Sequence, residues 1–229
     1  MRYVRIISIR LPRRTSSNFS PARRGEYSTA TATTANYIMM SIKEQANLIL
    51  RSSKSKNEKV LALCDLVREI PYQRTNNLDP QEMLRKGTGS CTPKHIFLAT
   101  YLEKIGIQVK FVVMSFYYWR MPLRYPQSKM ELVNEMPISY HVALKAKVEN
   151  KWVLIDVTWD SKLKGFPNSA GWKGEGDMKL AVIPEKIIEV RAEPNRFDKS
   201  EFVPYSKSDF ASKEPFHRFF DKFLTDSRK

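Results

Sequence analysis

The chain has 229 residues, of which 42% are hydrophobic and 28% are charged, as in an ordinary globular protein of one domain with or without extensions. No stretch approaches the roughly 20 consecutive apolar residues of a membrane-spanning helix, so we expect no transmembrane segment. Two cysteines cannot form a disulfide framework, which indicates free thiols in a reducing compartment. The net charge of +15 comes without a helix-turn-helix, zinc-finger or aromatic RNA-binding pattern, so we expect a solvated basic surface and no specific nucleic-acid binding.

Residues 1–40 differ in composition from the rest of the chain. The basic residues before Ser41 are all arginines, Glu26 is the only acid, and Ser, Thr and Ala dominate without core periodicity. Such a leader is typical of a disordered segment and of an organellar transit peptide. A solvated tail, or a start assigned too far upstream of Met39 and Met40, is the alternative. We therefore expect a cytoplasmic protein, or a mitochondrial one if the leader is a transit peptide.

Two capping boxes, Ser41 with Glu44 and Ser55 with Glu58, predict two helix starts. The second box opens the run KVLALCDLVREI, in which apolar residues recur at helical spacing on one face. Cys64 belongs to that face. We interpret it as a core residue rather than a reactive thiol.

The stretch GTGSC, residues 87–91, directly precedes a further helical pattern. Thr92 followed by Pro93 predicts the N-terminal cap of this helix, and Gly106 predicts its end. A thiol at a helix N-terminus ionises more readily, because the unsatisfied N–H groups and the helix dipole stabilise the thiolate. Cys91 is therefore either a nucleophile or a small buried side chain.

Of the three histidines in the chain, one can be paired with an aspartate. The runs QVKFVVMSFYYW, SYHVALKAKV and KWVLIDVTWD are β-patterned, and the last two should form a hairpin. If its turn centres on residues 149–150, His141 and Asp156 are diagonal neighbours on one face of the sheet, about 7–8 Å apart at the backbone. A lone aspartate inside an apolar strand must be paired or hydrogen-bonded, which favours an imidazole–carboxylate pair.

The other histidines are weaker candidates for a base. His95 lies one helical turn after Cys91, where a side chain leaves no room for a substrate, so we expect a packing histidine. His217 lies in the C-terminal tail, away from this region. Asp160 is a rival for Asp156, but its position after the second tryptophan argues against it.

The segments GTGSCTPKHIFLATYLEKIGIQVKFV, YHVALKA and KWVLIDVTWD together resemble the transglutaminase-like superfamily, over roughly residues 70–160. The resemblance lies in a Gly-x-Cys at a helix start, a strand histidine and a strand aspartate in a Trp-x-x-x-Asp-x-Thr-Trp context. It implies an α+β, papain-like/transglutaminase-like fold, in which N-terminal helices, including the Cys91-bearing helix, pack against an antiparallel β-sheet that carries His141 and Asp156. It also implies that Cys91 attacks an amide carbonyl, that His141 serves as base and then acid, and that Asp156 orients it.

Two features go with this resemblance. The family often supplies an oxyanion donor from a residue upstream of the cysteine, but no position here matches well enough to name one. The residues after Cys91, TPKH, differ from the small and aromatic residues common in active members.

The sequence thus predicts a cysteine-dependent acyl-transfer enzyme for an amide or isopeptide bond of a protein or peptide substrate, either a peptidase or amidase or a transglutaminase-type transferase. The alternative is a non-catalytic peptide- or glycan-binding module on the same fold. In either case Trp119, Tyr118 and Trp172 are the predicted binding residues. An arylamine acetyltransferase is a third hypothesis, but no acyl-cofactor site is evident. We expect no cofactor and no metal site, because the two cysteines lack close-spaced partners.

We divide the chain into the leader (1–40), a transglutaminase-like domain (41–195) and a C-terminal extension (196–229). The extension contains EPFHRFFDKFL, which places Phe216, Phe219, Phe220 and Phe223 at helical spacing. We expect this amphipathic helix to pack on the domain, with peripheral membrane or partner binding as the alternative.

Overall fold

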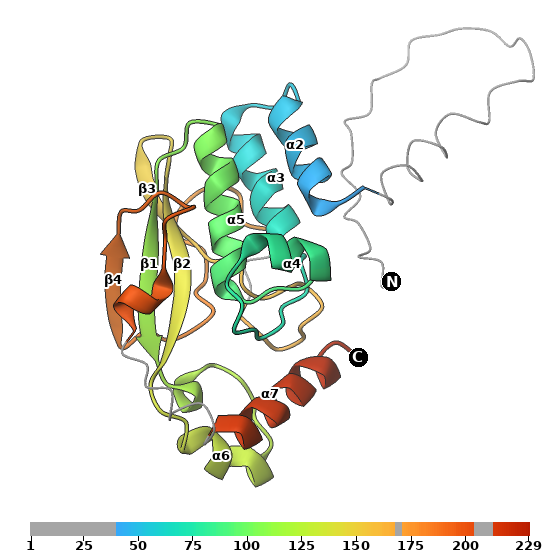
Figure 1. Ribbon diagram of the computed structural model, residues 1–229, viewed down its shortest axis with the longest axis vertical. Helices are drawn as coiled ribbons and strands as arrows, with labels where there is room; N and C mark the ends of the chain where they lie inside the picture. The colour runs from blue at the N-terminus through green and yellow to red at the C-terminus, as the bar shows by residue number, and fades with distance from the viewer. Residues whose placement is uncertain (1–39, 168–170, 204–212) are drawn as a thin grey trace, which may run out of the picture.

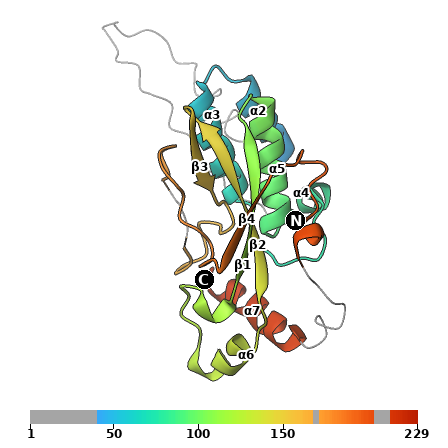
Figure 2. The same cartoon turned by 90° about the vertical axis from the view of Figure 1, so that its left-hand side faces the viewer.

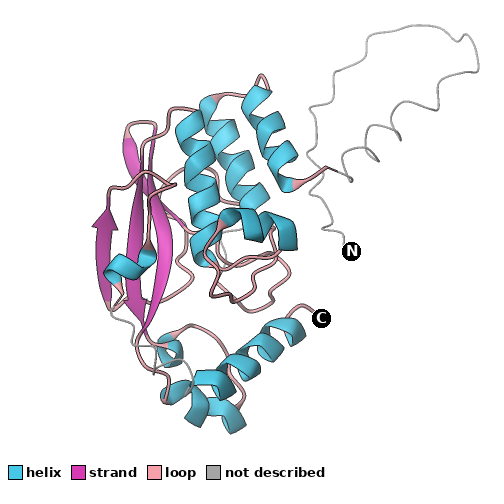
Figure 3. Ribbon diagram, in the orientation of Figure 1, coloured by secondary structure: helices cyan, strands magenta, loops and turns pink. Residues whose placement is uncertain are grey.

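The computed structural model describes residues 40–167, 171–203 and 213–229. The predicted leader therefore lies outside the described residues, apart from Met40. Within these ranges helices and strands form an α+β fold, in which helices pack on a four-stranded antiparallel sheet (Figure 1, Figure 3). No helix in the described part of the chain is long and apolar enough to cross a bilayer.

In the described chain four helices precede the first strand, one short α-helix lies between the first and second strands, and the last α-helix follows the fourth strand. The helices are α2 (Ile42–Arg51), α3 (Lys56–Arg68), α4 (Pro80–Lys86), α5 (Cys91–Lys104), α6 (Met130–Asn134) and α7 (Glu214–Asp226). The strands are β1 (Val109–Phe116), β2 (Ser139–Val148), β3 (Lys151–Ile155) and β4 (Lys186–Val190). Short 3-10 helices are η1 (Tyr118–Arg120), η2 (Gln127–Lys129) and η3 (Lys199–Phe202).

Both predicted capping boxes are present, and they explain where α2 and α3 begin. The Ser41 hydroxyl accepts from the Glu44 N–H at 3.2 Å, and the Glu44 carboxylate accepts from the Ser41 N–H at 2.7 Å. Ser55 and Glu58 repeat the pattern. In α3 the apolar face is buried as predicted, and the Cys64 side chain belongs to it.

The predicted hairpin is confirmed, with Val148 paired to Lys151 and the ladder continuing to Leu144 and Ile155. Its turn residues Glu149 and Asn150 have φ of 47° and 64°, the backbone of the two-residue turns that match the twist of the flanking strands. The sheet order is β3-β2-β1-β4.

One boundary differs from the prediction, because β3 ends at Ile155 and Asp156 lies one residue beyond the strand. The Asp156 carboxylate accepts from the backbone N–H of Thr158 at 3.2 Å. This local bond turns the chain away from the ladder.

The two faces of the sheet bury two hydrophobic clusters. On β1, Phe111 and Val113 join the cluster under α2, α3 and α5, whereas Val112 and Met114 join the second. Both views place α6 and α7 at the end of the sheet away from α2 (Figure 1, Figure 2).

The C-terminal helix α7 belongs to the second cluster. Phe216 and Phe220 are buried there, with Phe219 and Phe223 partly buried around them. The amphipathic helix therefore packs on the domain, as the spacing of its phenylalanines predicts.

Candidate active site

Cys91 is the first residue of α5, with Ser90 as the cap. The prediction of Thr92 as the cap is wrong, because the extended backbone ends at Ser90 (ψ −179°). Pro93 consequently lies within the first turn, where its missing N–H costs no intrahelical bond. The thiol therefore lies at the positive end of a 14-residue helix.

The loop before Cys91 is held at Gly89. The Gly89 N–H donates to the Pro71 carbonyl at 3.1 Å, and its carbonyl accepts from the Gln73 N–H at 3.1 Å. A Cβ on Gly89 would lie 2.5 Å from Cγ of Met83, which is buried. Any larger residue at this position would displace the Met83 side chain, so the backbone before Cys91 packs closely against α4.

His141 and Asp156 meet as the hairpin register predicts. His141 Nε2 lies 2.8 Å from Asp156 Oδ2, and the two residues are 3% and 5% exposed. The carboxylate also accepts from the Ala181 N–H at 2.8 Å and from the Thr158 hydroxyl at 2.6 Å. Burial disfavours the charged carboxylate, but the charge of His141 and these hydrogen bonds hold the pKa of Asp156 well below its usual range.

The third member of this cluster is the Cys91 thiol, whose pKa responds to the charge and the hydrogen-bonding ring of His141 and to the Val142 N–H. Because Asp156 occupies Nε2, the ring nitrogen left for the sulfur is Nδ1. Burial alone would raise the pKa of the thiol, but the charge of His141, its hydrogen bond and the charge of Lys199 lower this pKa to about 6. For His141, burial would lower the pKa, but the charges of Asp156 and Cys91 raise it to about 10. Both shifts favour a thiolate–imidazolium pair.

His95 is a packing histidine, as predicted, and it joins two parts of the site. Its Nδ1 donates to the Cys91 carbonyl at 2.8 Å, and its Nε2 accepts from the Val157 N–H at 3.1 Å. Burial lowers the pKa of His95 to about 4, so the ring is neutral and both nitrogens are engaged. It ties the start of α5 to the segment that carries Asp156.

Lys94 also joins α5 to the segment after β3, through its side-chain nitrogen. This role was not predicted from the sequence. Its side chain is fully buried, and Nζ donates to the carbonyls of Arg68, Ile70 and Thr158 at 3.0, 2.9 and 2.8 Å. Burial lowers the pKa of Lys94 to about 7, but three acceptors match the three N–H groups of the ammonium form. The one signal in the sequence was a lysine within TPKH, ahead of an otherwise apolar helical run.

Asp160 has a structural contact of its own. Its carboxylate accepts from the Tyr72 N–H at 2.9 Å and from Arg228 Nη2 at 2.7 Å. Arg228 also donates to the Tyr72 carbonyl at 2.8 Å. Asp160 therefore ties the segment after β3 to the C-terminus, and it is Asp156 that bonds to His141.

Two further side chains beside Cys91 were not predicted. Tyr72 is 8% exposed, with its ring edge-on to Trp159 at 4.4 Å. Burial raises the pKa of the Tyr72 phenol well above its usual value, and the charge of Cys91 adds to this shift, so the phenol lies within electrostatic range of the thiol. The second side chain is Lys199 of η3, which lies far after Cys91 in the sequence. Its charge and that of Cys91 interact electrostatically.

The three residues predicted to bind substrate do not gather in one place. The Tyr118 ring is buried in the second cluster against Phe216 at 4.5 Å, whereas Trp119 is 49% exposed. Trp172 is partly buried against the first cluster, and its Nε1 donates to backbone carbonyls of its own loop. Their binding role stays a prediction.

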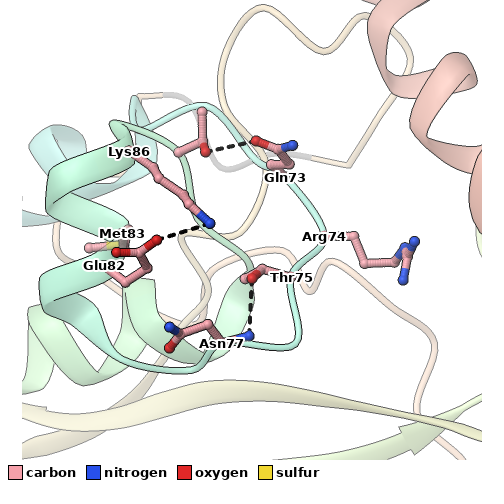
Figure 4. A pocket seen from close by; sticks show the side chains of 8 residues that line it. Gln73, Arg74, Thr75, Asn77, Glu82, Met83 and Lys86 are labelled. Carbon is pink, nitrogen blue, oxygen red and sulfur yellow. Dashed lines mark hydrogen bonds and ion pairs between the residues drawn. The ribbon is translucent and has the colours of Figure 1, made fainter.

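A polar pocket of about 140 Å³ lies between α4 and the loop before it (Figure 4). It is lined by Gln73, Arg74, Thr75, Asn77, Glu82, Met83, Lys86 and Thr88. Figure 4 shows Lys86 bonded to Glu82, and Arg74 pointing away from the other lining side chains. The pocket shares Thr88 with the loop that leads to Cys91.

The other thiol is also buried, but its pKa is shifted in the opposite direction from that of Cys91. Cys64 is 1% exposed, and burial raises the pKa of its thiol far above the usual value. Within the described ranges, no group of three or more His, Cys, Asp or Glu side chains is arranged to hold a metal ion.

Comparison with known proteins identifies the family. The profile of the transglutaminase-like superfamily matches residues 43–157, half of the chain. The chain therefore belongs to the transglutaminase-like superfamily, and its α+β architecture is the papain-like fold of that group.

Among solved structures, a proposed cysteine protease from Cytophaga hutchinsonii matches with 14% identity and a TM-score of 0.36. The match covers 61% of this chain and 42% of that one, so this chain spans less than half of that protein's length. No curated protein sequence matches this chain.

The buried ammonium of Lys94 gives a testable effect on stability. Lys94→Met removes the donor from three buried carbonyls, so we expect the free energy of unfolding to fall by about 3 kcal/mol. Urea denaturation measures it. Lys43→Met, an exposed lysine of α2, is the matched control and should change stability by less than about 0.5 kcal/mol. Equal, small effects of the two substitutions would contradict this role for Lys94.

Proposed function

We propose that the protein is a cysteine-dependent enzyme that acts on the carbonyl carbon of an amide or isopeptide bond in a protein or peptide. Cys91 is the nucleophile, His141 the acid and base, and Asp156 the group that orients the imidazole. One observation carries the proposal: a single imidazole bonds to a buried carboxylate at 2.8 Å and, through its charge, lowers the pKa of a thiol at a helix N-terminus.

In the first half of the reaction the Cys91 thiolate attacks the carbonyl carbon, and the carbonyl electrons move onto oxygen. The tetrahedral intermediate collapses when the carbon–nitrogen bond breaks. The imidazolium of His141 gives its proton to the leaving nitrogen, so an amine or ammonia departs and a thioester remains on Cys91. Asp156 keeps the ring oriented and stabilises its positive charge.

In the second half an acceptor attacks the thioester, and neutral His141 takes the acceptor's proton. The carbon–sulfur bond then breaks, which restores the thiolate and the imidazolium. With water as acceptor the product is a carboxylic acid, as in a peptidase or amidase. With an amine as acceptor the product is a new amide, as in a transglutaminase-type transferase.

Two donors near the sulfur suit the negative oxygen of the intermediate. The Cys91 N–H belongs to the first residue of α5, so no intrahelical acceptor is available to it. The Tyr72 phenol keeps its proton at neutral pH because its pKa is raised well above the usual value. We propose both as the oxyanion donors, with Tyr72 as the upstream residue.

The proposed roles predict distinct losses of activity. Cys91→Ala should abolish acyl transfer, and His141→Ala and Asp156→Asn should lower kcat by roughly 10³-fold or more. Two assays on a glutamine-containing peptide measure this: release of the cleaved product or ammonia, and incorporation of a fluorescent amine. Cys64→Ala is the control and should keep wild-type kcat. Activity that survives in Cys91→Ala would contradict the proposal, and a folded protein that binds peptide without turnover would favour the binding-module alternative.

The pH dependence follows from the ionised pair. The thiolate forms as pH rises through about 6, and the imidazolium is lost as pH rises through about 10. We therefore expect kcat/KM to follow a bell between these values, with its acid limb set by Cys91 and its alkaline limb by His141. Initial rates in constant-ionic-strength buffers measure the profile. A single rise near pH 9, the ordinary thiol value, would contradict the ion pair.

Tyr72→Phe removes only the hydroxyl from the proposed oxyanion site. We expect kcat to fall by about 10²-fold, while the rate at which iodoacetamide alkylates Cys91 stays unchanged, because the neutral phenol adds no charge to the thiolate. Tyr101→Phe is the control, since that hydroxyl bonds to Asn47 at 3.3 Å. A fall in the alkylation rate of Tyr72→Phe would mean that Tyr72 acts on the thiol instead.

A further inference from the structure

The segment from Phe197 to Val203 is anchored on the sheet at several points. The Phe197 ring stacks on the Phe111 ring of β1, with 3.9 Å between ring centroids. The Phe202 ring lies parallel to the Phe197 ring, with 6.2 Å between centroids. Val203 is buried. These apolar side chains lie just before η3, at its last residue and just after it, and so hold the short helix in place.

Lys199 begins η3, and its side chain is fixed as well as its backbone. Asp198 caps the helix by accepting from the Ser200 N–H at 2.8 Å. Lys199 Nζ donates to the Tyr140 carbonyl at 2.6 Å. Tyr140 directly precedes His141 on β2, so the ammonium is held beside the imidazole-bearing residue. The bond to the Tyr140 carbonyl uses one of the three N–H groups of the Lys199 ammonium.

Several groups from separate elements face the Cys91 sulfur. The charges of His141 on β2 and of Lys199 in η3 lower the pKa of Cys91, and the charge of Cys91 raises the pKa of the Tyr72 phenol, which lies in the segment before α4. Asp156 lies behind His141, and His95 on α5 bonds to the Cys91 carbonyl rather than to the sulfur. Of these groups, Lys199 and His141 are the two that can carry positive charge next to a thiolate.

We propose that Lys199 is a positioning residue for the nucleophile: a second fixed cation, beside His141, that stabilises the Cys91 thiolate. The inference rests on the proposed function, because it assigns a role in the same site. The effects of Lys199 and Cys91 on each other's pKa agree with this role. The charge of Lys199 lowers the pKa of Cys91, and the charge of Cys91 opposes the lowering of the Lys199 pKa by burial.

Lys199 differs from His141 in that the charge of His141 changes during the reaction. Once the imidazolium has given its proton to the leaving amine, His141 no longer offers a positive charge to the sulfur. Lys199 takes no part in that proton transfer and keeps its charge. When the thioester breaks down, the departing thiolate therefore has two cations beside it: the imidazolium that re-forms as His141 takes the acceptor's proton, and Lys199.

The test is the pH dependence of iodoacetamide labelling of Cys91 in the full chain, followed by peptide mass spectrometry. Lys199→Met removes the charge, and we expect the midpoint of labelling to rise by about 0.5–1 pH unit. Lys199→Arg keeps the charge and should keep a midpoint near 6. Lys199→Gln keeps a donor for the Tyr140 carbonyl but not the charge, so it should behave like Lys199→Met. Lys162→Met, an exposed lysine, is the control without effect.

The outcomes separate this inference from the proposed function. A wild-type midpoint near the ordinary thiol value of about 9 would overturn the nucleophile itself. A low wild-type midpoint that Lys199→Met and Lys199→Gln leave unchanged would overturn only the role of Lys199. A shift in Lys199→Met without one in Lys199→Gln would assign Lys199 a structural role through its hydrogen bond, and would also overturn the inference. Urea denaturation of each variant verifies that the labelled protein is folded.

Discussion

The hydrogen bond between Asp156 and His141 is the interaction on which the site depends. A carboxylate that is 5% exposed is stable as an anion only if it is paired and hydrogen-bonded. Asp156 meets this condition with donors from His141, Thr158 and Ala181. The charge of Asp156 raises the pKa of His141, and the charge of His141 lowers the pKa of Cys91, so this buried aspartate favours the ionisation of a cysteine on another element.

The same segment is fastened to the rest of the domain by its neighbours. Lys94 and His95, which follow the nucleophile on α5, bond to Thr158 and Val157 on either side of the turn after Asp156. Arg228 holds Asp160 a few residues further on. The TPKH sequence after Cys91, unusual for active members of the family, thus supplies the contacts that hold the cysteine and aspartate segments together. These contacts hold the start of α5 against the segment that carries Asp156.

The parts of the site that sequence could predict are those set by local rules. The two-residue turn at Glu149 and Asn150 sets the hairpin register, and the register brings His141 to Asp156. Capping boxes set the starts of α2 and α3, and helical spacing assigned Cys64 to the core. The wrong prediction of Thr92 as the cap of α5, in place of Ser90, was also a local error. Thr92 followed by Pro93 fits a helix start almost as well as the residues before them.

Long-range contacts were not predictable from the same patterns. Tyr72, Lys199 and Arg228 reach the site from segments far from Cys91 in the chain, and nothing in their own neighbourhoods indicates it. Lys94 is a lysine within a buried helix, and its burial is explained by the three backbone carbonyls that accept from its ammonium group. A single sequence shows the periodicity of an element, but not which charge will be buried against which backbone.

The most direct test of a thiolate nucleophile compares the two cysteines of one folded molecule. Iodoacetamide at pH 7, with peptide mass spectrometry at timed intervals, gives a labelling rate for Cys91 and for Cys64. The ion pair predicts that Cys91 is labelled at least about 100-fold faster than Cys64, and that His141→Ala removes most of this difference. Slow and similar labelling of both cysteines in the wild-type protein would contradict it.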